Sequence, residues 1–503
     1  MSGKTTIFTH QRFNDFMNGS TKTIFKQTSI YSIGNTLRKL SGVFILPLVK
    51  HYTSQEEFGV WMLLETIFVF TQVLSGWGVK SGLTRWYYDM VSELEKKRLF
   101  FTAMVFNYAM SLLTIGIIGG VLACFSDQIL KYDISSRLIW VFIISGLFRL
   151  LHELPFIVLR LQQKAMKQTA YSSFNVLLLV LFTFFFLEFS RQGFIGVFKA
   201  QLWSNLITFL VLIPVIVKNS QPVFKWAELK EMIHYGIPLA FSNILTTVLN
   251  LSDRHIINQF QNPAESGSYG LSFKVANLLE MVLVTSFITS YTYFYFKSLN
   301  DPDSFKVFKK LQRYFLILLA IVGFGIVLFA REIIWVTSVG DAFYQDGVYL
   351  VPFLILGLMF GGLRQFFTLP LNKHKKTRAI SRILISGGIV NVVLNVWLVP
   401  QYGKQGAAWA TLFVQFFMMV WFYLESGKCE TLTINIKESL LLLFIWGGFV
   451  AVSFFVPENL FLALLYKASL MGFFLLALFL FKVIRLDEIK ELIETVKGVL
   501  QRK

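Results

Sequence analysis

Long runs of apolar residues, separated by short polar segments, recur along almost the whole chain. A helix needs about 20 such residues to cross roughly 30 Å of hydrocarbon. Only 15% of the residues are charged and the mean hydropathy is +0.60, whereas soluble domains are about one quarter charged. The sequence therefore predicts an all-α polytopic membrane protein with about fourteen transmembrane helices. The predicted spans are 28–49, 57–79, 99–123, 137–159, 169–188, 194–217, 232–252, 268–293, 312–330, 347–369, 380–399, 406–424, 438–456 and 459–481.

The distribution of Lys and Arg predicts how these spans are oriented. If both termini are cytoplasmic, about 33 of the 47 cations lie in cytoplasmic segments, about 7 lie outside and 7 lie within spans. This is the excess of Lys and Arg on the cytoplasmic side that membrane proteins show. It also accounts for the net charge of +18 without a nucleic-acid partner. Residues 1–27 contain no apolar stretch followed by a cleavage site, so we expect the first span to act as an uncleaved insertion signal.

Short motifs repeat at an offset of a little over 200 residues and predict two parallel bundles. Residues 191–193 (Arg-Gln-Gly) match 404–406 (Lys-Gln-Gly), residues 160–164 match 370–374, and residues 57–59 match 268–270. Six spans separate each pair, so both halves run in the same direction, as in several transporters. The predicted organisation is a tail (1–27), a six-helix bundle (28–217), a cytoplasmic linker (218–231), a second bundle (232–424), two additional helices (425–481) and a cytoplasmic tail (482–503).

Charged residues within spans are the candidate functional groups, because each is costly in hydrocarbon unless it faces protein, water or a ligand. The cations are Arg38, Lys39, Arg149, Lys199, Lys274, Arg364 and Lys467, and the acids are Glu65, Glu153 and Glu280. Three acids neutralise at most three cations, so a cationic cavity for a phosphate-bearing substrate is predicted. Arg38 is the favoured residue, because it lies near the middle of the first span.

Each candidate also has a structural interpretation. Arg149 and Glu153 are four residues apart on one helix face, so an ion pair is an alternative to a substrate role. His152 is either a proton relay or a buried structural histidine. Lys199 and Lys274 could extend to the outer interface, and Lys467 lies in the additional helices, where a peripheral position is expected.

Several catalytic classes leave no signature in the chain. It contains no phosphate-binding loop, no zinc-binding His-Glu-x-x-His motif and no nucleophile elbow. Cys124 and Cys429 fall on opposite sides of the predicted topology, so they neither pair nor share a metal. We therefore expect no enzyme activity, catalytic residues, metal or cofactor.

Four segments resemble the polysaccharide-transport (O-antigen type) flippases. They are residues 34–42 (Gly-Asn-Thr-Leu-Arg-Lys-Leu-Ser-Gly), Leu46-Pro47, residues 54–61 (Ser-Gln-Glu-Glu-Phe-Gly-Val-Trp) and residues 83–89 (Leu-Thr-Arg-Trp-Tyr-Tyr-Asp). Ser252-Asp253-Arg254 is also similar to that family. The family belongs to the multidrug/oligosaccharidyl-lipid/polysaccharide exporter superfamily, and the resemblance covers roughly the first twelve spans.

This resemblance implies translocation of an undecaprenyl-diphosphate-linked oligosaccharide to the outer leaflet of the bacterial inner membrane, by alternating access. It implies Arg38 and Lys39 in a basic cavity, and Arg85, Asp253 and Arg254 as gating, coupling or structural residues. Glu65, His152, Glu153 and Glu280 are further candidates for coupling or gating. The implied partners are the lipid-linked oligosaccharide, membrane lipids, an H⁺ or Na⁺ coupling ion and polysaccharide polymerases.

Three other classes remain as alternatives. An ion-coupled multidrug or small-molecule efflux transporter of the same superfamily should carry more acids than bases in its cavity. A facilitator-type sugar transporter usually carries a Gly-x-x-x-Asp-Arg motif after its second span, where this chain has residues 82–89 (Gly-Leu-Thr-Arg-Trp-Tyr-Tyr-Asp). A membrane glycosyl polymerase or ligase usually has a long outer loop, and none is predicted here.

Overall fold

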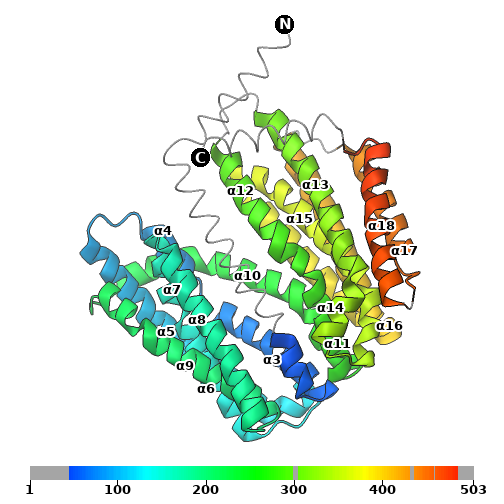
Figure 1. Cartoon of the computed structure of the whole chain (residues 1–503). Helices are drawn as coiled ribbons and strands as arrows, with labels where there is room; N and C mark the ends of the chain where they lie inside the picture. Colours follow the sequence, from blue (N-terminus) through cyan, green and yellow to red (C-terminus); the bar gives the residue numbers. More distant parts are fainter. Residues whose placement is uncertain (1–44, 298–303, 431–434, 458, 485–503) are drawn as a thin grey trace, which may run out of the picture. The chain divides into compact units, whose positions relative to one another are not determined.

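The computed structural model describes residues 45–297, 304–430, 435–457 and 459–484, and in these ranges the chain is helical with no strand (Figure 1). Eleven helices are long and apolar enough to cross a membrane. One of them, Thr377–Gly427, covers two predicted spans, and the 17-residue helix Ile436–Val452 covers a further one. Thirteen of the fourteen predicted spans therefore fall on described helices. The chain is a multi-pass membrane protein, and its first predicted span, 28–49, lies mostly outside the described residues.

The chain divides into two compact units, Met1–Thr247 and Val248–Lys503. The division falls within α10, inside the seventh predicted span, so the bundle boundaries predicted from the sequence stay predictions. The first unit contains α3 (Gln55–Leu74), α4 (Val79–Trp86), α5 (Glu93–Leu130), α6 (Ser136–Leu151), α7 (Glu153–Leu161), α8 (Ala165–Phe184), the π-helix η1 (Phe185–Phe189), α9 (Phe194–Asn219) and the first part of α10 (Trp226–Phe260).

The second unit contains the last part of α10, α11 (Pro263–Ala276), the π-helix η2 (Glu280–Val284), α12 (Thr285–Lys297), α13 (Ser304–Leu328), α14 (Ala330–Thr337), the 3₁₀-helix η3 (Ala342–Leu350), α15 (Val351–Lys373), α16 (Thr377–Gly427), α17 (Ile436–Val452) and α18 (Leu460–Leu480). The pair α17–α18 lies side by side at one flank of this unit (Figure 1). Phe324 of α13 packs against Phe449 of α17 and Phe474 of α18, with ring centroids 6.1 and 4.7 Å away. Aromatic packing therefore attaches the additional helices to α13.

Three local features occur in the same order in both units and locate the internal repeat. α3 is capped by Ser54, whose side chain accepts from the backbone N–H of Glu57, and α11 is capped by Asn262, which accepts from that of Glu265. Such caps satisfy backbone donors that a helix start leaves unbonded. Both units thus begin their second predicted span with a polar cap and an acid three residues later.

The other two features are turns that require a left-handed backbone. Gln163 before α8 and Lys375 before α16 have φ of 57° and 55°. Gly193 precedes α9 with φ 58° and ψ −145°, and Gly403 breaks α16 with φ 58° and ψ −141°. Glycine adopts this conformation without the strain that a side chain would add. The break at Gly403 is the turn between the eleventh and twelfth predicted spans.

These features correct the register of the repeat. They pair Glu57 with Glu265, where the sequence motif paired it with Ser268, and Gly193 with Gly403, where the motif used Gly406. The predicted register was wrong by three residues at both places. Short matches in apolar sequence do not fix a register, whereas a cap or a left-handed turn occurs at one defined residue.

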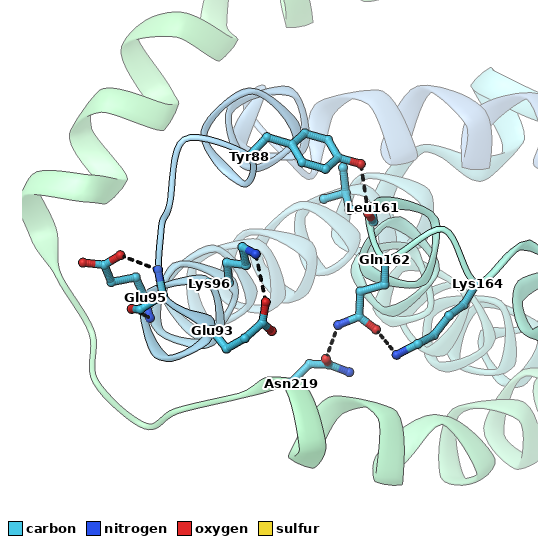
Figure 2. A network of polar contacts seen from close by, with 9 residues as sticks. Tyr88, Glu93, Glu95, Lys96, Leu161, Gln162, Lys164 and Asn219 are labelled. Atoms are coloured by element: carbon cyan, nitrogen blue, oxygen red, sulfur yellow. Dashed lines mark hydrogen bonds and ion pairs between the residues drawn. The ribbon is translucent and has the colours of Figure 1, made fainter. Parts of the chain in front are cut away.

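Loop segments of the first unit are joined by side-chain hydrogen bonds on the predicted cytoplasmic side (Figure 2). After α7, the carbonyl of Leu161 accepts from Tyr88 Oη at 2.9 Å, and Gln162 Nε2 donates to Asn219 Oδ1 at the end of α9 at 2.5 Å. Lys164 Nζ donates to Gln162 Oε1 at 2.7 Å. The turn after α7 is thereby tied to the ends of two other helices.

Candidate functional site

Arg149 of α6 pairs with Glu65 of α3 inside the first unit. Arg149 Nη1 donates to Glu65 Oε2 at 3.0 Å, and Gln201 Nε2 of α9 donates to Glu65 Oε1 at 2.8 Å. The guanidinium also lies 4.1 Å from the ring centroid of Phe68, a distance that suits a cation–π contact. The carboxylate of Glu65 thus accepts hydrogen bonds from two other helices, and Arg149 is neutralised by a group of its own unit.

The predicted pair between Arg149 and Glu153 is wrong. Glu153 begins α7, after the helix has been interrupted at His152, and its Oε2 forms an ion pair with Lys80 of α4. Lys80 Nζ also donates to the carbonyl of Gln72 at 3.3 Å. Glu153 thus pairs with a residue of α4, and Arg149 pairs with a residue of α3. The sequence analysis did not include Lys80, because the second span was predicted to end at residue 79.

His152 is a buried structural histidine in this arrangement. Its Nε2 donates to the backbone carbonyl of Asn205 at 2.8 Å, and its ring contacts Phe156. Asn205 in turn accepts from Asn175 Nδ2 at 3.2 Å and donates to Ser145 at 3.4 Å. These bonds link α6, α8 and α9, and a proton-relay role for His152 stays a prediction.

Asp253 lies in a buried polar cluster of the second unit, with 1% of its surface exposed. Its Oδ2 accepts from Tyr269 Oη at 2.5 Å and from Thr411 Oγ1 at 3.1 Å. Its Oδ1 is buried and has no hydrogen-bond partner within the described residues. A buried carboxylate with an unsatisfied oxygen is costly unless a proton or a cation accompanies it.

The residues beside Asp253 extend this cluster. Ser252 Oγ donates to Asn391 Oδ1 of α16 at 3.2 Å, and Asn395 Nδ2 donates to the same oxygen at 3.2 Å. Arg254 is buried as well, and its guanidinium lies 5.1 Å from the ring centroid of Phe273. Asp253 and Arg254, predicted as gating or coupling residues, thus lie inside the second unit and not on a loop surface.

Arg364 of α15 is a half-buried cation. Its Nη1 lies 3.4 Å from Met418 Sδ, and the guanidinium lies 5.9 Å from the ring centroid of Phe422. Glu280 of η2 exerts an electrostatic effect on it, but no carboxylate forms an ion pair with Arg364 in the part of the chain that the structure describes. Gln415, also on α16, has a buried Oε1 without a partner there.

The remaining predicted cations have other environments. Lys199 Nζ donates to the side chain of Gln192 at 2.5 Å, near the predicted outer side, and Lys274 is partly buried on α11. Arg85 pairs with Asp89 at 2.6 Å on an exposed surface. Arg38 and Lys39 lie outside the described residues, so their role stays a prediction.

Lys467 is buried, with 1% of its side chain exposed, although it lies in the additional helices. Its Nζ donates to both carboxylate oxygens of Glu332, at 2.6 and 2.5 Å. The helix that carries Lys467 lies at the flank of its unit, as expected, but the side chain itself is buried. Within the described ranges, no group of three or more His, Cys, Asp or Glu residues could hold a metal ion.

Comparisons with known proteins agree with this fold. The family model described as "Polysaccharide biosynthesis protein" matches residues 53–337, more than half of the 503-residue chain. No curated protein matches. Among solved structures, the lipid II flippase MurJ, in an inward closed conformation, is similar with a TM-score of 0.73 and 15% identity over 90% of this chain and 99% of MurJ.

Multidrug transporters have the same fold. An inward-facing multidrug resistance transporter of the MATE family, in the MOP superfamily, has a TM-score of 0.64 and 12% identity over 80% of this chain and 99% of its own. A MATE transporter from Vibrio cholerae has a TM-score of 0.58 and 13% identity over 82% and 98%. At these identities the similarity establishes the fold alone.

Proposed function

The chain belongs to the polysaccharide biosynthesis proteins, and on that premise we propose that it is a flippase for undecaprenyl-diphosphate-linked oligosaccharide. It would carry this substrate from the cytoplasmic to the outer leaflet of the bacterial inner membrane, for surface polysaccharides such as O-antigen. The family match covers residues 53–337. The chain is not an enzyme in this proposal, because translocation requires no covalent step.

The observation that carries the choice of substrate is the environment of Arg364. A guanidinium inside a membrane helix is retained at a cost of several kcal/mol, so it normally has a partner. Arg364 contacts a thioether and an aromatic ring but forms no ion pair with a described carboxylate. A diphosphate supplies the bidentate anionic oxygens that a guanidinium binds best. Arg38, Lys39 and Lys274 would add further positive charge in the same role.

The second part of the proposal is coupling to a cation. Asp253 presents one buried, unsatisfied carboxylate oxygen beside the hydroxyls of Tyr269 and Thr411. Binding of H⁺ or Na⁺ there would neutralise the carboxylate and change the stability of the contact between α10 and α16. A ligand shifts a conformational equilibrium only through different affinities for the two states. Alternating access would thus be driven by occupation of this site.

The test is a deletion strain in which lipid-linked oligosaccharide and surface polysaccharide are both measured. Accumulation of undecaprenyl-linked oligosaccharide together with loss of surface polysaccharide, both restored by the gene, supports the proposal. Normal polysaccharide together with new sensitivity to toxic compounds supports the multidrug efflux alternative. Complementation with Arg38→Ala or Arg364→Ala then tests the cationic site, since both variants should insert in the membrane but fail to restore surface polysaccharide.

A further inference from the structure

A second buried polar cluster lies in the first unit, away from Arg149 and from the Asp253 cluster. Its centre is the ion pair between Lys80 of α4 and Glu153 of α7. Glu153 Oε1, the oxygen next to the one that contacts Lys80, is buried and has no hydrogen-bond partner in the described segments. Both side chains are largely buried.

One buried polar side chain of α5 lies close to Lys80, and a second lies one turn further along α5. Asn107 is fully buried, and neither its Nδ2 nor its Oδ1 has a partner among the described residues. Asn107 Nδ2 and Lys80 Nζ each lie 3.3 Å from the point where a side chain on Gly76 would begin, so they share the space that this glycine leaves. Ser111, one turn along α5 from Asn107, is also fully buried and its Oγ is likewise without a described partner.

Four buried polar atoms without a partner among the described residues, on neighbouring parts of α5 and α7, are unusual in a folded protein. A buried polar atom without a hydrogen bond is costly, and more so when it is charged. Such groups in native structures are therefore satisfied by ordered water, an ion or a ligand. Three of the four atoms are oxygens: a carboxylate oxygen, an amide oxygen and a hydroxyl oxygen. Hard monovalent and divalent cations prefer oxygen ligands of this kind.

We propose that Glu153, Asn107 and Ser111 form a binding site for a monovalent cation, Na⁺ or a hydrated proton, in the first unit. The Lys80 ammonium pairs with the Glu153 carboxylate when the site is empty. A bound cation takes the place of the ammonium and breaks this ion pair. The net charge of the cluster is then conserved, because one positive group replaces another. Burial lowers the pKa of Lys80 to about 8, so the site does not favour a permanent ammonium.

The other charged groups near Glu153 do not compete for its carboxylate. The elements packed against α7 are α4, α6, α8 and α9. Their charged residues are Lys80, Arg85, Arg137, Arg149, Lys167, Lys199 and Lys218. The charged residues of α5, which carries Asn107 and Ser111, are Glu93, Glu95, Lys96, Lys97, Arg98 and Asp127, all within its first or last turns. Arg85 pairs with Asp89, Arg149 pairs with Glu65 and Lys199 contacts Gln192. An ion pair with Glu153 is formed by Lys80 within the described part of these helices.

The position of Lys80 also connects cation binding at Glu153 to the packing of α4 against α10. Lys80 lies between Gly78 and Gly82, which both approach α10 closely. A Cβ added to Gly78 would lie 2.0 Å from the backbone of Gly236, and one added to Gly82 would lie 2.6 Å from the backbone of Met232. Release of Lys80 from Glu153 therefore frees the helix on which the start of α10 packs. This cation site goes beyond the proposed function, since it concerns the other unit and does not depend on which substrate is carried.

The experiment measures the melting temperature of the purified full-length protein in lipid nanodiscs. Asp253→Asn is the background, so that a response to cations comes from another site. In one arm NaCl replaces choline chloride at fixed pH, and in the other the pH falls from 8 to 6 in choline chloride. Binding to the folded state raises the melting temperature by about 2–4 °C near saturation, and the responding arm identifies Na⁺ or the proton.

We expect the response to persist in Asp253→Asn and to disappear in Asp253→Asn/Glu153→Gln. Asn107→Leu in the same background keeps the Lys80–Glu153 pair and should also abolish the response, which guards against misfolding of the first variant. Glu188→Gln, at an exposed carboxylate, is the matched control and should leave the response intact. No response in Asp253→Asn, or an unchanged response in both Glu153→Gln and Asn107→Leu, overturns the proposal. These results are independent of the polysaccharide assay.

Discussion

Arg149 and Glu65 form an ion pair 3.0 Å long between α6 and α3, and this contact decides what Arg149 does. The second oxygen of Glu65 accepts from Gln201, so the carboxylate has partners on two other helices. This counter-charge supports the structural interpretation of Arg149, and its contact with a substrate stays a prediction. Arg149 therefore connects helices of the first unit, and Arg364 is the better candidate for substrate contact.

The first prediction concerns the coupling within this pair. Arg149→Met leaves a partly buried carboxylate without its counter-charge and should destabilise the protein by roughly 1–3 kcal/mol. Arg149→Met/Glu65→Met removes both charges and should recover at least half of that loss, because no charge is then left unpaired. Thermal unfolding of the three proteins checks this. Strictly additive effects would mean that the two residues do not interact.

A second prediction separates charge from geometry at Arg364. Arg364→Gln should reduce complementation of a deletion strain at least tenfold at unchanged protein level, because the anionic group of the substrate loses its partner. Arg364→Lys should retain an intermediate activity, since an ammonium keeps the charge but not the planar pair of donors. Lys199→Gln is the matched control, because Lys199 already contacts an amide. Full activity of Arg364→Gln would remove Arg364 from the binding site.

The membrane spans could be predicted from the sequence because hydropathy and span length reflect a single physical requirement. Thirteen of the fourteen predicted spans fall on described helices, and the polar caps at Ser54 and Asn262 lie close to predicted span starts. The existence of these helices depends on local composition, which can be read directly from the sequence. The contacts that each helix makes depend on tertiary packing, which cannot be read from local composition.

The ion pairs illustrate this limit. Spacing alone allowed an Arg149–Glu153 pair, but tertiary packing brings Lys80 of α4 to Glu153 and Glu65 of α3 to Arg149. Lys80 was overlooked because it follows directly after a predicted span. Gln201 and Gln415 also escaped attention, although an uncharged amide within an apolar span is itself a signal. A search for charged residues alone therefore misses the contacts that these amides make.

A third prediction tests the close approach of α4 and α10 in the first unit. Gly236→Ala places a methyl group 2.2 Å from the carbonyl oxygen of Gly78. Because the clash is with a backbone atom, it can be relieved only if the two helices move apart. We expect a loss of roughly 3 kcal/mol or more in stability, or failure to accumulate in the membrane. Gly116→Ala on α5 meets open space and should be neutral or slightly stabilising. Membrane abundance and melting temperature measure both variants.

The last prediction concerns Asp253, whose carboxylate is the proposed coupling group. Asp253→Asn keeps the volume of the side chain, and its amide oxygen can still accept from Tyr269 and Thr411, as Oδ2 does at 2.5 and 3.1 Å. The change therefore removes the negative charge while retaining the contact between α10, α11 and α16. We expect the variant to fold, because these contacts are kept.

Transport by the same variant should nevertheless fail. A neutral amide binds neither a proton nor a sodium ion at this position, so a cation gradient has no means of changing the balance between the two states of the transporter. Surface polysaccharide should be lost while the protein stays folded and abundant in the membrane, and Asp133→Asn, at an exposed carboxylate, should affect neither. A folded Asp253→Asn protein with full complementation would place the coupling group elsewhere. A variant that is both inactive and destabilised would instead assign Asp253 a structural role, through its bonds to Tyr269 and Thr411.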